Sequence, residues 1–232
     1  MLGLAGTREV GAIDIPRVDW QGRLEAQFRA NKPDNGETSS GQIYTGEIIG
    51  NSYVWQPWFG NWRARMAFSK LLTQSERDSD GYIFSGDGRL NLFHRSRFPV
   101  EAFFNIQDSR VDFEASDVST DTRAAQVGIN HRYTNLNGDK SYQILALHDR
   151  QEDFSLGSKD QSNRLLLTGQ MRKDRHNLNA SAFLNDRDSN IGGFNQLDGQ
   201  LNVNHSWRPS SHLSVDTNGS NPKKSVSHFS RV

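Results

Sequence analysis

Two acidic segments of the chain have the residue types of a calcium site. Asp78-Ser-Asp80-Gly81 and Asp186-Arg-Asp188-Ser-Asn190 each place two carboxylates two residues apart, and Ca²⁺ prefers oxygen ligands. An EF-hand loop also needs a bidentate Glu at its twelfth position, which is Arg89 when counted from Asp78. Asp, Ser, Asn and Gly are also ordinary turn residues. The sequence therefore favours turns at both segments, and we expect neither a metal nor another cofactor.

His148-Asp149 has the residue types of a general base and its carboxylate partner. Neighbouring residues of a strand point to opposite faces, so this pair does not suit catalysis. Ser141 and His148 are also an odd number of residues apart and would face opposite sides. No two of the seven histidines have the i, i+2 or i, i+4 spacing of a metal site,. We expect no catalytic residues and a protein that is not an enzyme.

Composition excludes several broad classes of protein. The 232 residues are 34% hydrophobic with a mean hydropathy of −0.74, and no stretch approaches the ~18 apolar residues of a membrane helix,. A net charge of zero argues against nucleic acid as a partner,. The absence of cysteine excludes disulfides and thiolate metal sites,. Five Trp and thirteen Phe argue against disorder,.

Turn signals recur near Pro57, Phe98, Gly138, Arg175 and Pro209, at intervals of 34 to 41 residues. Longer polar segments lie between them and are expected to be loops: 31–41, 76–81, 115–121, 152–163 and 185–193. The joining segments of about 10–14 residues exceed the ~5–6 of an average strand. They match the ~9–11 residues of a strand that crosses a bilayer.

Residues 18–30 give the clearest strand pattern. Val18, Trp20, Leu24 and Phe28 are among the apolar even positions, whereas every odd position from 19 to 29 is polar. This period of two predicts a strand with one apolar face. Asn137-Gly138 predicts a hairpin with a type I′ turn. The same reading along the chain predicts about eleven long strands.

Aromatic residues cluster near the short turns, as in an interfacial girdle. The girdle candidates are Trp55, Trp58, Trp62, Phe98, Tyr133, Tyr142 and Trp207. A second set lies nearer the longer loops: Tyr44, Tyr82, Phe84, Phe113, Phe154, Phe183 and Phe194. Two bands one strand length apart favour a membrane barrel over a soluble sandwich with plugged ends.

Over residues 18–217 the pattern resembles Gram-negative outer-membrane β-barrel proteins, porin-like ones included, although no specific family matches. The resemblance implies an all-β, antiparallel up-and-down transmembrane barrel or partial barrel in the cell outer membrane, with periplasmic turns near 57, 97, 138, 174 and 209. It implies the lipid bilayer and lipopolysaccharide as partners, together with an envelope protein, and a longer parent chain as the source of any missing strands. Arg63, Arg65 and Arg89 are the lumen candidates, where arginines pair with carboxylates or bias a pore toward anions.

The chain divides into an N-terminal lead (1–17), the barrel (18–217) and an irregular tail (218–232). The lead lacks the apolar core of a secretory signal,, so we expect a trimmed or partial sequence. The expected function is non-enzymatic transport, export or assembly at the outer membrane. The alternative is a soluble all-β binding or adhesion module with ligand contacts in the long loops.

Overall fold

The computed structural model describes residues 16–31, 39–74, 79–113, 119–191, 194–210, 213–222 and 226–229. Most of the predicted lead, residues 1–15, lies outside them. The described residues form twelve β-strands. These are β1 (Asp19–Asn31), β2 (Ser39–Val54), β3 (Gly60–Gln74), β4 (Ser79–Leu92), β5 (Val100–Phe113), β6 (Ser119–Thr134), β7 (Lys140–Asp153), β8 (Ser158–Lys173), β9 (His176–Ser189), β10 (Phe194–Ser210), β11 (Leu213–Pro222) and β12 (Val226–Phe229).

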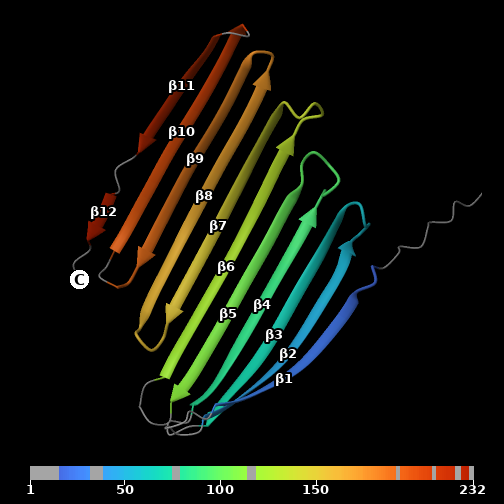
Figure 1. Cartoon of the computed structure of the whole chain (residues 1–232), viewed down its shortest axis with the longest axis vertical. Helices are drawn as coiled ribbons and strands as arrows, with labels where there is room; N and C mark the ends of the chain where they lie inside the picture. The colour runs from blue at the N-terminus through green and yellow to red at the C-terminus, as the bar shows by residue number, and fades with distance from the viewer. Residues whose placement is uncertain are drawn as a thin grey trace, which may run out of the picture.

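The strands form one antiparallel up-and-down sheet in chain order from β1 to β11, as Figure 1 shows. The prediction of an all-β chain with eleven hairpin-connected strands is confirmed. The sheet is open, because β1 pairs with β2 alone among the described strands. β12 pairs with Phe194–Leu197 of β10, beyond the part of β10 that pairs with β11. β11 and β12 therefore lie one after the other along the same edge of β10.

The predicted irregular tail at 218–232 is wrong for all of its described residues, 218–222 and 226–229. β11 continues through Pro222 and β12 covers Val226–Phe229. Backbone pairing with β10 explains the difference, since a neighbouring strand satisfies the hydrogen bonds of a segment that has no apolar alternation of its own.

The contrast between short turns and longer loops is also wrong. At the predicted loop ends, β7 continues to Asp153 and β8 begins at Ser158, which leaves only residues 154–157 as the connection. At the predicted turn ends, β4 and β5 are joined by residues 93–99. The strands, of up to 17 residues, take in the polar segments that the sequence assigned to loops. We call the end with connections 55–59, 93–99, 135–139 and 174–175 the turn end, and the other the opposite end.

The hairpin between β6 and β7 is present, but its turn differs from the prediction. Type I′ needs positive φ at both central residues, whereas Asn137 has no positive φ and Gly138 has a φ of 71°. The Gly138 N–H donates to the Asn135 carbonyl at 3.1 Å. This is a type I turn followed by a glycine in the left-handed region.

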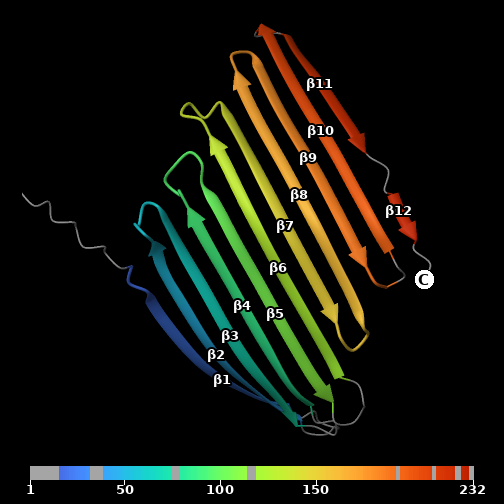
Figure 2. The same cartoon turned by 180° about the vertical axis from the view of Figure 1, so that it is seen from behind.

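The sheet is a single layer, and both views show its strands side by side with nothing stacked on either face (Figures 1 and 2). Among the described residues no hydrophobic side chain is buried. The strands are also staggered. Following the paired residues straight across the sheet from Gly50 of β2 leads to Asn163 of β8. Gly50 is four residues from the turn end of its strand at Val54, whereas Asn163 is ten residues from the turn end of its strand at Lys173. Such a shear is what closing a sheet into a barrel requires. No described helix is long and apolar enough to cross a membrane.

Candidate functional site

The two faces of the sheet have opposite chemistry. Directly paired residues lie on the same face and successive residues alternate, so the registers assign every strand residue to a face. One face, the apolar face, carries Trp20, Ile48, Met66, Phe104 and Ile129. The other, the polar face, carries every odd residue from Asp19 to Arg29 in β1 and polar side chains of β6–β10 such as Gln143, Thr168 and Ser181.

In β5, β6, β8 and β9, the apolar residues of the apolar face lie toward the turn end. They cover Val100–Ile106 in β5, Ala125–Tyr133 in β6, Leu165–Met171 in β8 and Leu178–Leu184 in β9, taking alternate positions. We call this stretch the apolar band. Its side chains are open to the surroundings, with Phe104 47%, Val127 51% and Ile129 49% exposed.

Beyond the apolar band the same face becomes charged toward the opposite end. Asp108 follows Ile106 on this face, and Arg123 follows Ala125 in the neighbouring strand. Arg123 Nη2 lies 2.7 Å from Asp108 Oδ2, and Lys70 Nζ lies 3.4 Å from Asp80 Oδ2. From β5 onward the strands are therefore longer than their apolar part and carry charged residues at the opposite end of this face.

Aromatic rings border the apolar band at the turn end, and we call them the aromatic band. Their ring centroids lie 5.5 Å apart for Trp55–Phe59, 5.0 Å for Phe59–Phe93, 4.9 Å for Phe98–Tyr133 and 5.2 Å for Tyr133–Tyr142. Trp58 packs against Trp55, and Trp207 stacks on His176 at 6.1 Å. Trp62, the remaining girdle candidate, lies on the apolar face opposite Leu90. The structure thus places all seven girdle candidates at one end of the sheet.

The second aromatic set does not form a matching band. Tyr44 packs against Phe28 and Tyr82 against Phe68 on the apolar face of β1–β4. Phe183 lies on the polar face, and Phe154 lies in a turn beneath the Arg123 guanidinium. The side chains of Phe113 and Phe194 lie outside the described part of the chain. From β5 onward, charged residues occupy the opposite end of the apolar face instead.

The three lumen candidates lie together on the polar face of β3 and β4. Arg65 Nε lies 3.0 Å from Asp87 Oδ1 and 3.5 Å from Glu47 Oε1, so the guanidinium links three strands. Arg89 Nε lies 3.2 Å from Glu101 Oε1 of β5. Arg63 is directly opposite Arg89, and no ion pair of Arg63 is found within the described residues. Two of the candidates therefore hold neighbouring strands together.

Further ion pairs lie on the polar face at the opposite end. Arg164 of β8 binds Asp149 of β7, with Nη2 2.5 Å from Oδ2. Arg187 of β9 donates to Asp160 of β8 through Nε and Nη2, and its Nε lies 3.0 Å from Oδ1. Every described cationic side chain of the polar face is an arginine, whereas the strand lysines 70, 140, 159 and 173 lie on the margins of the apolar face. Arginine suits this position because its planar group binds carboxylates bidentately.

The restriction of the strand lysines to the apolar face is visible in the sequence once the strands are aligned. Sequence reasoning missed it because the face of each residue depends on strand bounds and registers that one strand alone does not give. The pairs Arg164–Asp149 and Arg187–Asp160 both join segments predicted to be loops or loop borders.

The candidate calcium and catalytic residues form no common site within the described part of the chain. Asp78 lies outside the described residues, and Asp80 pairs with Lys70. His148 Nδ1 lies 2.8 Å from Asn163 Oδ1 on one face, while Asp149 binds Arg164 on the other. Within the described residues, no three His, Asp or Glu side chains come close enough to hold a metal ion.

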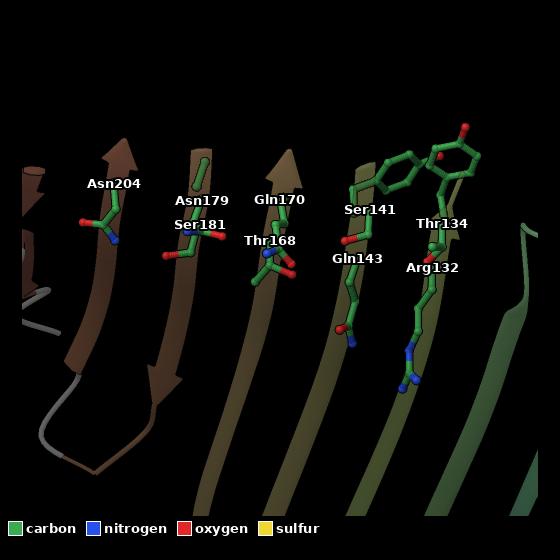
Figure 3. Close-up of a pocket in the computed structure, with 13 residues that line it drawn as sticks. Arg132, Thr134, Ser141, Gln143, Thr168, Gln170, Asn179, Ser181 and Asn204 are labelled. Atoms are coloured by element: carbon green, nitrogen blue, oxygen red, sulfur yellow. The ribbon is translucent and has the colours of Figure 1, made fainter. Parts of the chain in front are cut away.

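A shallow concavity of about 470 Å³ lies on the polar face near the turn end of β6–β10 (Figure 3). Its labelled side chains extend from five neighbouring strands on one side of the sheet: Arg132, Thr134, Ser141, Gln143, Thr168, Gln170, Asn179, Ser181 and Asn204. Arg132 is the single charged residue of the lining. We call this hollow the amide-hydroxyl concavity.

Comparison with solved structures finds outer-membrane proteins. The chain is similar to in-vitro folded OmpT of Vibrio cholerae in its trimer form (8% identity, 90% of each chain, TM-score 0.40). It is also similar to the translocator domain of the autotransporter NalP from Neisseria meningitidis (10% identity, 92% of this chain and 85% of that one, TM-score 0.32). The β domain of the Bordetella autotransporter BrkA gives 11% identity, coverage of 92% and 95%, and a TM-score of 0.32.

No protein-family model matches the chain, and no curated protein matches its sequence. Identities near 10% and TM-scores below 0.5 do not assign a family, so the function proposed below depends on this chain's own two faces.

Proposed function

We propose that this chain forms the wall of an outer-membrane β-barrel with a non-enzymatic role in transport, export or assembly. The observation that carries the proposal is the apolar face, which is continuous over the sheet and which no described element covers. Soluble proteins rarely expose apolar patches larger than a few hundred Å². A lipid bilayer would cover this face and leave the polar face to an aqueous lumen.

The size of the apolar band supports a bilayer. The stretches Val100–Ile106 and Ala125–Tyr133 are seven and nine residues long, which corresponds to about 23–30 Å along a strand. A strand tilt of about 40° reduces this to about 18–23 Å, close to the ~25 Å apolar band of membrane barrels. The aromatic band lies where the headgroup boundary would be.

The asymmetry of the strands gives the proposed orientation. The turn end, with its aromatic band, would face the periplasm. The charged opposite end would project outward into the headgroup layer, where lipopolysaccharide is the proposed lipid partner. The outer edge of β1 carries unpaired backbone groups in the described sheet, and an unpaired edge accepts another strand. Further strands, or an envelope protein, would pair there.

A pair of adjacent single-cysteine variants tests which face meets lipid. The chain has no cysteine, so Leu167→Cys on the apolar face and Thr168→Cys on the polar face each introduce one thiol without further changes. After reconstitution into phospholipid vesicles, we expect a nitroxide attached at position 167 to be broadened by oxygen, which partitions into lipid. A nitroxide attached at position 168 should respond instead to a water-soluble nickel chelate.

Lys159→Cys, which is on the apolar face but beyond the apolar band, is the control for the membrane boundary. Its nitroxide should respond to the nickel chelate although it shares a face with Leu167. Equal accessibility of positions 167 and 168 to the chelate would contradict the barrel and would favour a soluble binding module.

A further inference from the structure

The polar face of β6–β10 contains two chemically different zones. At the opposite end, a concavity of about 390 Å³ is lined by the paired charges Arg164–Asp149 and Arg187–Asp160. At the turn end, the amide-hydroxyl concavity has no carboxylate in its lining. Leu145, Leu166 and Phe183 pair across three strands between the two zones, and Phe183 is 37% exposed.

Many polar groups of the amide-hydroxyl concavity remain available. Gln143 donates to the buried Asn130 at 2.9 Å and is already engaged. The side chains of Thr134, Ser141, Thr168, Asn179, Ser181 and Asn204 make no hydrogen bond within the described residues. Hydroxyl and amide groups both donate and accept, and polar groups that have lost part of their water favour a ligand that replaces it.

The chemistry of the lining selects the class of ligand. A cation would find no carboxylate, and an anion would find only Arg132, which already has a partner. A ligand that is itself a mixed donor and acceptor fits the hydroxyl and amide groups, and an apolar side of the same ligand fits the neighbouring Phe183 and Leu166. A volume of about 470 Å³ lies within the ~300–1,000 Å³ of small-molecule sites,.

We propose that the amide-hydroxyl concavity binds a neutral polyhydroxylated solute, of the size of a di- or trisaccharide. The hydroxyl edge of the sugar meets Thr168, Asn179 and Ser181, and its carbon-bound hydrogens pack against Phe183. This proposal rests on the proposed function, because the barrel turns this face toward the lumen. It assigns a substrate class to the transport role.

Titration with raffinose, a neutral trisaccharide, tests the proposal. The full chain is folded in lauryldimethylamine oxide, since maltoside or glucoside detergents would compete for the site, and binding is followed by saturation-transfer difference NMR. We expect saturable binding that weakens about tenfold in the Thr168→Val, Asn179→Leu double variant, because two hydrogen-bonding groups are lost. The matched Thr122→Val, Gln151→Leu variant, on the polar face of β6 and β7 near the opposite end, should bind as the parent does.

Three outcomes would overturn the proposal: no saturable raffinose signal, equal binding by the double variant, or equal binding of the anionic trigalacturonate. Preferential binding of triglycine would overturn it in favour of a polypeptide ligand. The nitroxide accessibility of positions 167 and 168 is measured separately, on the two labelled variants in phospholipid vesicles. If those variants place the apolar face in lipid and the parent chain does not bind raffinose, the sugar site alone is refuted.

Discussion

At the scale of single residues, Arg65 explains most about the polar face. Its guanidinium lies between Glu47 and Asp87 on the two neighbouring strands, while Arg89 pairs with Glu101. Ion pairs this exposed contribute only about 0.2–1 kcal/mol each. In the proposed barrel their larger consequence would be for the lumen, because they hold charges of both signs in place on its wall.

Replacing Arg63, Arg65 and Arg89 with glutamine should shift the ion selectivity of the reconstituted protein toward cations. The three changes remove positive charge and leave Glu47, Asp87 and Glu101 without their cations, so a lumen there would attract potassium. The measurement is the reversal potential of planar bilayers in a potassium chloride gradient. Lys70→Gln, at the margin of the apolar face, is the control and should leave selectivity unchanged. An unaltered reversal potential in the triple variant would exclude a lumen role for these arginines.

At the scale of strands, the sequence predicted the existence of each strand well and its ends poorly. Each expected strand is present, because alternation such as that of Val18–Ala30 is local and is read directly from the residues. The ends were wrong because Asp160, Arg187 and their neighbours have the composition of loops. Their strand conformation depends on partners in other strands, such as the Arg187–Asp160 pair. Which residues of two strands lie opposite each other cannot be determined from the pattern of one strand alone. The gathering of aromatic residues at the turn end was predictable because these residues lie close to the turn signals in the sequence.

An arginine in the middle of the apolar band should destabilise the protein far more than one on the polar face. Ile129 lies at the centre of Ala125–Tyr133 and is 49% exposed, so in a bilayer Ile129→Arg would place a charge in lipid. The expected cost is about 2–4 kcal/mol. Thr122→Arg, on the polar face of the same strand, should cost less than about 0.5 kcal/mol. Urea unfolding of the two variants in vesicles measures both, and equal costs would contradict a lipid-facing band.

At the scale of the whole molecule, a sheet without a second layer lacks the usual source of stability. Folding in water is driven by burial of apolar surface, yet the described residues include no buried hydrophobic side chain. Backbone pairing along eleven strands fixes the sheet but leaves its apolar face in contact with the surroundings. We therefore expect the medium to supply an apolar layer for the described sheet.

Folding of the chain should accordingly require detergent micelles or lipid. We expect β-type circular dichroism and a heat-modifiable gel mobility after refolding into micelles, and aggregation after refolding in buffer, where the apolar faces of separate chains would cover one another. The two refolding reactions differ only in the micelle, so the chain in buffer is its own control. A monomer that unfolds cooperatively in buffer alone would show that the apolar face is covered from within the chain. That result would favour the soluble module over the outer-membrane barrel. The second layer over the apolar face would then come from the protein itself, and lipid would not be needed to cover it.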